Sequence, residues 1–320
     1  MNEVNFINVS GGKDSTAVLL LALEMQPPNM RFVFADTGHE HPEVYRYLDY
    51  LERELGVSIE RLRNDFTDRL ARRRKRIEET WEEPERSRAL EVMHATGNPF
   101  LDLCLWKGIF PSNSIRICTQ FLKVEPINKV QNEALDKADR VVTWLGIRKD
   151  ESASRSTAVT WEREFGPEDQ PDAGLWKYRP ILDWTAADVF DFIHKKGLQS
   201  NPLYRQGMGR VGCMPCIMAR KSEIAEIANR FPDEIDRVER WEAIVNQSIR
   251  KQNGTFIAAS RFGYDNPDDI TSATHGIRKA VEWAKTSRGG RQFGLDFESG
   301  GGCSSIYGLC ETGDNKEDSE

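Results

Sequence analysis

The sequence predicts an α/β fold in which helices cover both faces of a parallel sheet. Three short apolar runs, at residues 4–9, 30–35 and 140–146, have the length and composition of buried strands. A helical apolar period follows the first two runs, over residues 17–23 and 42–55. Strands that alternate with helices in this way are typical of a parallel sheet, which binds ligands at the carboxyl ends of its strands.

The first strand ends in a glycine turn that opens the first helix, with the sequence N-V-S-G-G-K-D-S-T-A over residues 8–17. Glycines let the backbone turn tightly, and a helix N-terminus presents N–H groups and positive charge to an anion. The turn therefore predicts a phosphate site made by Ser10, Gly11, Gly12, Lys13, Asp14, Ser15 and Thr16. The alternative is an ordinary strand–helix turn capped by Ser or Asp. The spacing matches neither the G-x-x-x-x-G-K-[ST] nor the G-x-G-x-x-G motif.

The second strand also ends in polar residues, which are Asp36, Thr37 and Gly38. Because parallel strands end at the same edge of a sheet, we expect these residues to share one cleft with the glycine turn. The remaining α/β elements are predicted, in chain order, as a helix at 42–55, strands at 57–62 and 140–146, and a helix at 183–196.

The α/β rhythm breaks between residues 65 and 117, which predicts a helical insertion. Its basic run at 69–76 favours a solvated helix with ion pairs four residues apart, and the alternative is a helix that contacts the phosphates of a polynucleotide. We expect a nucleotide-binding α/β domain over residues 1–200, which includes this insertion. A cysteine-bearing helical and loop region over 201–310 follows, helical from 222 to 251, and then a disordered acidic tail over 311–320.

Bulk composition excludes several classes of protein. Of the 320 residues, 39% are hydrophobic and 30% charged, and no apolar run approaches the roughly 20 residues that span a bilayer. No signal peptide is recognisable at the start, which predicts a cytoplasmic protein. A net charge of −7 argues against a uniformly basic surface that coats nucleic acid, although it allows local basic patches.

Six cysteines in a cytoplasmic chain are expected to be thiols or metal ligands rather than disulfides. Cys104 lies in an apolar context and is predicted to be a buried structural thiol. The other five lie in turn segments and are candidate metal ligands: Cys118, the C-x-x-C pair Cys213 and Cys216, and the glycine-flanked Cys303 and Cys310. Zinc and a four-cysteine iron–sulfur cluster need the same number of ligands, so the spacing leaves both open, as well as unligated thiols. His39 and His41 flank a turn before Pro42, and a metal role for them is the less favoured interpretation.

Taken in order, the motifs of this chain resemble those of the phosphoadenosine phosphosulfate reductase family, with the phosphate loop of ATP pyrophosphatases. The phage and DNA phosphorothioation branches of the family look nearest. The motifs that carry the resemblance are residues 10–16, residues 36–38, Cys118-Thr119 with Lys123 and Pro126, residues 146–152 with Arg155, residues 180–184 with Asp188 and Val189, and residues 212–216.

The resemblance implies a fold of the adenine nucleotide alpha-hydrolase type and an enzyme that cleaves ATP between the α- and β-phosphates. Such an enzyme activates a substrate oxygen by adenylation, and a sulfur nucleophile then displaces AMP. The implied cofactors are ATP, Mg²⁺ and a [4Fe–4S] cluster, with zinc as the alternative metal. The implied catalytic residues are Lys13, Asp14, Arg148, Glu151 and Arg155, of which the last three could instead form a surface ion-pair network. Implied partners are nucleic acid, with DNA favoured over RNA, and a sulfur-donor protein such as a cysteine desulfurase, but no membrane.

Two departures from the family bear on the reaction. Reductases of sulfonucleotides generally have a degenerate phosphate loop, whereas this chain keeps S-G-G-K-D-S. Their C-terminal Glu-Cys-Gly-Leu-His segment has no counterpart here, because no histidine follows Cys310. The phosphate loop and the C-terminal segment both favour ATP-driven sulfur insertion on nucleic acid over sulfite release by a sulfonucleotide reductase with Cys303 or Cys310 as nucleophile. In addition, Thr119 stands where cluster-bearing members have a second adjacent cysteine. A subunit that binds nucleotide or nucleic acid without catalysis is the third possibility.

Overall fold

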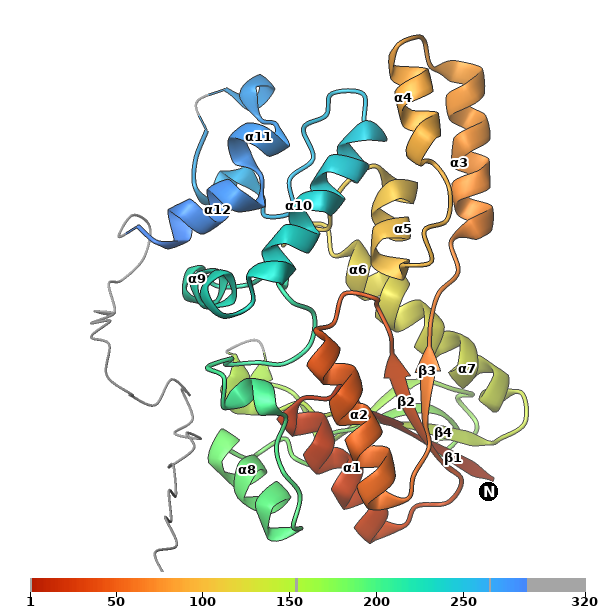
Figure 1. Cartoon of the computed structure of the whole chain (residues 1–320). Helices are drawn as coiled ribbons and strands as arrows, with labels where there is room; N and C mark the ends of the chain where they lie inside the picture. The colour runs from red at the N-terminus through yellow and green to blue at the C-terminus, as the bar shows by residue number, and fades with distance from the viewer. Residues whose placement is uncertain (1, 153–154, 265, 287–320) are drawn as a thin grey trace, which may run out of the picture.

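The computed structural model describes residues 2–152, 155–264 and 266–286. Its α/β part is built on a six-stranded sheet, whose strands lie in the lower half of the view in Figure 1. The strand order is β3-β2-β1-β4-β6-β5, and all neighbours are parallel except the edge pair β5 and β6. The strands are β1 (Glu3–Asn8), β2 (Met30–Ala35), β3 (Ile59–Leu62), β4 (Arg140–Trp144), β5 (Trp161–Phe165) and β6 (Gly174–Tyr178). The predicted fold class is confirmed.

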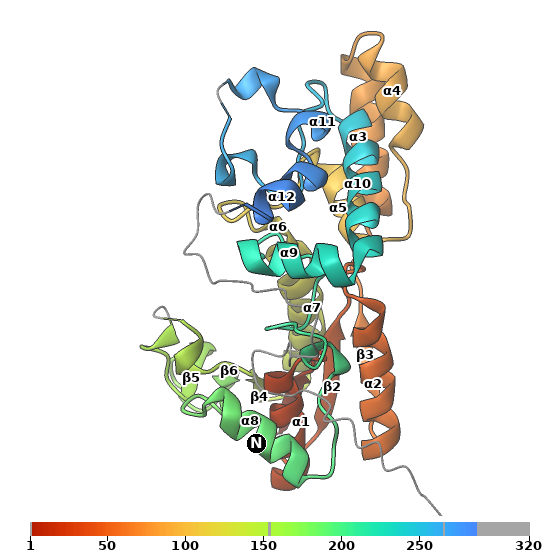
Figure 2. The same ribbon diagram turned by 60° about the vertical axis from the view of Figure 1, so that its left-hand side comes forward.

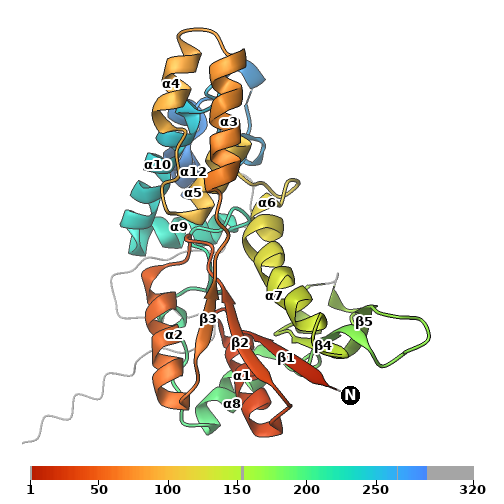
Figure 3. The same cartoon turned by 90° about the vertical axis from the view of Figure 1, so that its right-hand side faces the viewer.

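Helices cover both faces of this sheet. On one face α1 (Lys13–Met25), α2 (Pro42–Leu55) and α8 (Ala186–Lys195) bury a large apolar core that includes Ile7 and Val18. On the other face α7 (Glu125–Leu135) packs on a smaller cluster with Phe6 and Val141 at its centre. Figure 3 shows α7 and α2 on opposite sides of the strands. Successive side chains of β1 thus point alternately into the two cores, as the pleat of a strand requires.

A second, helical layer stands beyond the carboxyl ends of the strands (Figure 2). The insertion supplies α3, α4 and α5, and the chain after residue 220 supplies α9, α10, α11 and α12; α10 packs against α4 and α5. The bounds are α3 (Thr67–Thr80), α4 (Glu85–Val92), α5 (Pro99–Lys107), α9 (Lys221–Arg230), α10 (Pro232–Gln247), α11 (Ser272–His275) and α12 (Ile277–Ala284). Short turns complete the chain: α6 (Ile117–Thr119), the π-helix η1 (Gln120–Val124), η2 (Lys149–Glu151), η4 (Pro202–Tyr204), η5 (Ala259–Arg261) and η6 (Pro267–Asp269).

Several predicted boundaries differ from the structure for local reasons. The strand expected at 57–62 begins at Ile59, and the helix expected at 183–196 begins at Ala186, because Thr185 and Asp188 form a capping box there. The segment expected to be helical over 222–251 divides into α9 and α10 at Pro232, whose ring cannot continue a helix. Strands β5 and β6 lack a long apolar run, since β5 is largely exposed, and they were not predicted. The tail expected at 311–320 lies outside the described residues.

Candidate active site

The glycine turn is held in shape by its own hydroxyl groups. Ser10 N donates to Ser15 Oγ at 2.9 Å, and the Oγ atoms of Ser15 and Thr16 each donate to the Gly12 carbonyl at 3.0 Å. Gly11 has φ +74°, and a Cβ at this position would lie 2.9 Å from Val44 Cγ1. A side chain at Gly11 would therefore be strained and would collide with α2.

The turn η4, which lies far along the chain, donates and accepts hydrogen bonds that support the glycine turn. Asn201 Nδ2 donates to the Gly11 carbonyl at 3.1 Å, and Lys13 N donates to the Tyr204 hydroxyl at 2.9 Å. Both supporting side chains are buried, at 1% and 2% exposure. The sequence reasoning missed Asn201 and Tyr204, and the only local signal was the Asn-Pro turn that begins η4.

A chain of charges connects the loop with the segment after β4. Asp14 accepts from Lys13 Nζ at 2.9 Å and from Arg148 Nε at 2.6 Å. The Arg148 guanidinium, 4% exposed, also pairs with Asp150 at 2.5 Å. Burial works against its charge, but the two carboxylates outweigh burial and raise the pKa of Arg148. Gly146 permits this approach, since a Cβ there would lie 2.9 Å from the Asp14 carbonyl carbon.

Glu151 extends the chain to Arg155. Its Oε2 atom accepts from Arg148 N at 3.1 Å and forms an ion pair with the Arg155 guanidinium. The side chain of Arg155 is 41% exposed. The structure therefore brings the five candidate catalytic residues into one series of contacts. Arg148 is buried and paired with Asp14 and Asp150, whereas Arg155 is accessible from solvent.

The second polar turn, after β2, joins the sheet to the helical layer. Asp36 accepts from Gly38 N at 3.0 Å, from the Tyr45 hydroxyl at 2.7 Å and from Arg63 Nε at 2.6 Å. Gly38 has φ +72°, and its carbonyl accepts from Asn98 Nδ2 at 2.6 Å, beside the N-terminus of α5. Burial, with a further contribution from Glu40, raises the pKa of Tyr45, so its hydroxyl remains a donor.

Residues 37–40 of this turn also contact the C-x-x-C segment. Thr37 Oγ1 donates to Glu40 Oε1 at 2.7 Å, and Cys213 Sγ lies 3.6 Å from both of these oxygens. The backbones pair as well, because Glu40 and Cys213 form an antiparallel bridge and Met214 N donates to the His39 carbonyl at 3.0 Å. The polar turn after β2 is thus attached directly to the cysteine segment.

Three candidate ligand cysteines surround Lys123. The nearby Cys213 is the largest cause that raises the pKa of Lys123, Glu40, Cys216 and Cys118 act in the same direction, and burial opposes them. Burial raises the pKa of Cys213 to about 12, although Lys123 opposes this. Burial likewise raises the pKa of Cys118, and Cys104 is fully buried as predicted.

The donor chemistry fits a thiolate-bound metal centre in part. Three partly buried thiols and one charge-balancing ammonium come together, but within the described ranges no group of three or more His, Cys, Asp or Glu residues is placed to hold one metal ion. The remaining candidates, Cys303 and Cys310, lie outside the described residues.

The two histidines of the turn have structural contacts. His39 is 1% exposed, its Nε2 lies 2.7 Å from the Pro215 carbonyl, and its Nδ1 lies 3.3 Å from Arg237 Nη2. Its ring stacks on Phe100 at 4.4 Å. Burial lowers the pKa of His39 to about 3, so the ring is neutral. His41 caps α2 by accepting from Glu43 N.

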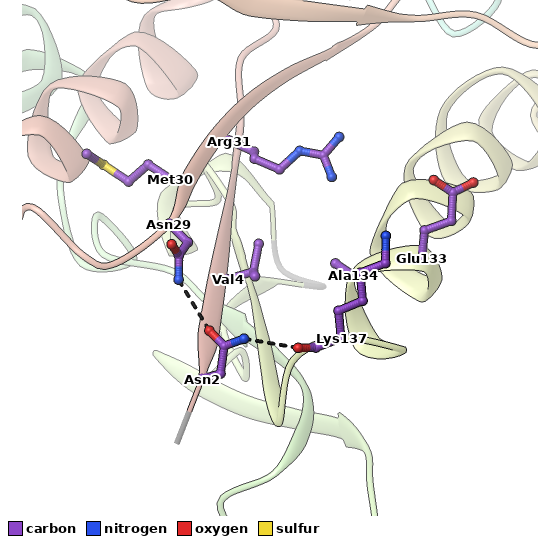
Figure 4. A pocket seen from close by; sticks show the side chains of 8 residues that line it. All are labelled: Asn2, Val4, Asn29, Met30, Arg31, Glu133, Ala134 and Lys137. Atoms are coloured by element: carbon purple, nitrogen blue, oxygen red, sulfur yellow. Dashed lines mark hydrogen bonds between the residues drawn. The ribbon is translucent and has the colours of Figure 1, made fainter.

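Two open surface hollows lie away from this site, at the amino ends of the strands. The first has a volume of about 400 Å³, and Figure 4 shows its lining, in which Asn2 bonds Asn29 and the Lys137 carbonyl. The second, of about 500 Å³, lies between the end of α7 and the β5–β6 hairpin. Neither contains a residue of the glycine turn or a cysteine.

Comparison with known proteins gives consistent matches. The profile of the phosphoadenosine phosphosulfate reductase domain matches residues 5–219. A 37.8 kDa uncharacterised protein of Escherichia phage 186 is 45% identical over 331 residues, which cover 97% of each chain. An uncharacterised protein of Methanocaldococcus jannaschii is 29% identical over 76% of this chain, which spans only 42% of that protein. Phosphoadenosine 5'-phosphosulfate reductase of Buchnera aphidicola is 28% identical over 66% of this chain and 69% of its own length.

Solved structures match more distantly. Phosphoadenylyl-sulfate reductase of Candida auris, in a phosphate complex, has a TM-score of 0.41 at 19% identity and covers 67% of this chain and 81% of its own. FMN adenylyltransferase of Candida glabrata has a TM-score of 0.37 at 14% identity, over 66% and 53%. Within the described part of the chain, no helix has the length and apolar character that would let it cross a bilayer.

Proposed function

Because the chain belongs to the phosphoadenosine phosphosulfate reductase family, we propose that it is an ATP pyrophosphatase that adenylates a substrate oxygen for sulfur insertion into nucleic acid. The observation that carries this proposal is the intact S-G-G-K-D-S loop, joined through Asp14 to the buried Arg148. A loop that only binds a nucleotide needs backbone N–H donors. Cleavage between the α- and β-phosphates also needs positive charge that stabilises the negative charge on the leaving pyrophosphate.

In this proposal the triphosphate lies over the N-terminus of α1, and the adenosine lies near Asp36, Thr37 and Gly38. The phosphates compete with Asp14 for the Lys13 ammonium, which then neutralises charge on the β- and γ-phosphates. Asp14 would hold Mg²⁺, which supplies further charge stabilisation when bound. Arg148 fixes the position of Asp14, since its guanidinium pairs with Asp14 and is itself held by Asp150 and the Trp184 carbonyl. Arg155 pairs with Glu151 but is accessible from solvent, so its guanidinium can also contact the α-phosphate or the acceptor.

Cys118, Cys213 and Cys216 would hold the [4Fe–4S] cluster, with Cys303 or Cys310 as the fourth ligand and zinc as the alternative metal. A bound cluster would supply sulfur for attack on the atom that carries the adenylated oxygen, and that oxygen would leave with AMP. Binding it requires that the thiols lose their protons, which the raised pKa of Cys213 opposes and the Lys123 ammonium favours. A sulfur-donor protein such as a cysteine desulfurase would replenish the sulfur, and DNA is favoured over RNA as acceptor.

A second candidate is a sulfonucleotide reductase, because relatives named phosphoadenosine 5'-phosphosulfate reductase are 26–28% identical over about two thirds of the chain. It predicts sulfite release with a thiol reductant and leaves ATP intact. A non-catalytic nucleotide- or nucleic-acid-binding subunit predicts binding without either product.

Anaerobic purification followed by assays of iron, visible absorption and pyrophosphate release tests the proposal. We expect a brown protein that releases pyrophosphate from ATP with Mg²⁺, and a Cys213→Ala variant with less iron and no sulfur transfer. The exposed Met218→Ala variant, two residues beyond the C-x-x-C motif, serves as the control. Unchanged iron content and sulfur transfer in the Cys213 variant would contradict the cluster, and an absence of pyrophosphate would contradict the ATP reaction.

A further inference from the structure

We propose that Arg69 and Lys107, held on the rings of Trp106 and Phe121, form a binding site for a backbone phosphate of the nucleic-acid acceptor. The inference rests on the proposed function for the identity of that acceptor. Its location follows from the structure of the insertion. The site lies where α3, α5 and η1 meet at the base of the helical layer (Figure 3).

Two cations share the same pair of rings. Lys107 Nζ lies 3.8 Å from the centroid of Trp106 and 4.6 Å from that of Phe121. Arg69 Cζ lies 4.8 Å and 5.3 Å from the same two centroids. The rings meet edge to face at 5.0 Å, and each cation lies within the range of a cation–π contact from both ring centroids.

One carboxylate faces these two cations, because Glu125 pairs with Arg69 and its negative charge also acts on Lys107. Arg69 pairs with Glu125, whereas the contacts shown for the Lys107 ammonium are the two aromatic rings. A third cation, Arg73, lies behind them and donates to the carbonyls of Trp106 and Ser248. Burial and the neighbouring Arg69 lower the pKa of Lys107, and together they outweigh Glu125, which acts in the opposite direction. A phosphate bound beside Lys107 would add a second negative charge to two cations that now share one carboxylate.

The basic run of α3 is thereby divided into two groups. Arg74 and Lys75 form the pairs four residues apart that the sequence predicts, with Glu78 and Glu79. Arg69 and Arg73 instead face α5 and η1. The site is therefore confined to one side of the helix and is not a general basic surface.

The position relative to the thiols favours a substrate phosphate over a purely structural role. Phe121 lies in η1, three residues after Cys118, and Lys107 ends the helix that carries Cys104, whose thiol is close enough to Cys118 for their charges to interact. A lysine in the last turn of α5 is explained by the helix dipole alone. The dipole does not explain why a second cation shares its rings. A phosphodiester bound here would hold the strand next to the candidate sulfur-bearing cysteines.

Binding of a fluorescein-labelled single-stranded DNA oligonucleotide to the full chain, measured by anisotropy at several salt concentrations, tests the inference. Lys107→Gln is expected to weaken binding about fivefold and to reduce the salt slope by about 0.7, which is the value for one phosphate contact on a single strand. Lys107→Arg is expected to retain binding. Lys75→Gln, on the outer side of α3, is the matched control and should bind as the wild type does.

Equal affinity and salt slope for Lys107→Gln and wild type, or an equal loss in Lys75→Gln, would overturn the inference. Displacement of the oligonucleotide by low millimolar inorganic phosphate in the wild type would also overturn it, since the site would then bind free phosphate. Pyrophosphate release from ATP is measured on the same samples. If ATP stays intact while binding depends on Lys107, the proposed function fails and the phosphate site stands; if ATP is cleaved and binding ignores Lys107, only the site fails.

Discussion

At the scale of single residues, Asp14 has the most demanding position in the candidate site. Its carboxylate meets one flexible cation, Lys13, and one buried cation, Arg148, and it is 17% exposed itself. The carboxylate therefore stabilises the loop, and it is also the group that the ATP phosphates must displace from Lys13. Asp150 is the other carboxylate that pairs with Arg148 among the described residues, and it is considerably more exposed.

Asp14→Asn is expected to lower the free energy of unfolding by about 1–3 kcal/mol, because a buried guanidinium loses one of its charged partners. It should also reduce pyrophosphate release by at least tenfold. Urea unfolding and the pyrophosphate assay measure the two effects. Asp183→Asn is the control, since Asp183 forms an exposed pair with Lys149 and should be neutral. If both variants behave alike, Asp14 has no special role.

How far the sequence predicts individual residues depends on where their partners lie along the chain. Lys13, Asp14 and Arg148 belong to short motifs with a phosphate-binding rationale, so they were predicted. Asn201 and Tyr204 were missed because they act through the backbone of the glycine turn from about 190 residues away. Arg63 was missed for the same reason, since its partner Asp36 is fixed only by the pairing of β2 with β3.

At the scale of elements, the junction of β1 and α1 depends on the turn η4. The Tyr204 hydroxyl takes up one of the first N–H groups of α1, a group that has no partner within a helix. Asn201 holds the preceding peptide. Together they fix the direction in which the remaining N–H groups of the loop point.

Tyr204→Phe is expected to raise the KM for ATP about three- to tenfold with a smaller change in kcat, because it removes one hydrogen bond, worth about 0.5–1.5 kcal/mol, from the nucleotide loop. Steady-state pyrophosphate release gives both constants. Tyr264→Phe, on an exposed side chain, serves as the control. A Tyr204→Phe enzyme with the wild-type KM would show that η4 does not position the loop.

The elements themselves were predictable where burial makes a sequence periodic. Strands β1, β2 and β4 are apolar because both faces are covered, and α2 shows one apolar stripe. Strand β5 pairs with one neighbour and exposes Trp161 and Phe165, so its composition does not distinguish it from a loop. The division between α9 and α10 was visible in principle at Pro232.

At the scale of the whole molecule, His39 connects the sheet to the helical layer. Its ring contacts Phe100 of α5 and Trp241 of α10, and its two nitrogens face the Pro215 carbonyl and Arg237. One neutral imidazole thus joins the polar turn after β2, the C-x-x-C segment and two helices. No sequence signal places these four segments together, because the contact requires the finished packing of both layers.

The stability of the protein should therefore fall in acid. The pKa of His39 is about 3 in the folded protein and about 6.5 in an unfolded chain, so between these values the unfolded chain binds more protons. The stabilisation is fully present above pH 6.5 and is lost as the pH falls toward 3, by at most about 1.4 kcal/mol per pH unit. Urea unfolding at pH 7.5 and pH 5.0 measures this loss.

His39→Asn should show a smaller loss of stability between these two pH values than the wild type, by up to about 2 kcal/mol. His94→Asn, on an exposed histidine, should keep the wild-type loss. A His39 variant with the same pH dependence as the wild type would show that this ring does not couple the layers.

The central claim is that this chain cleaves ATP between its α- and β-phosphates. The direct measurement uses anaerobic protein, Mg²⁺, single-stranded DNA and ATP labelled in the α-phosphate, with phosphoadenosine phosphosulfate and a thiol reductant in a parallel sample. We predict pyrophosphate and an equal amount of labelled AMP, either free or attached to the DNA, the loss of both products in Lys13→Gln, and no sulfite in the parallel sample. Sulfite release with ATP left intact, or ADP and phosphate as the products, would contradict the account.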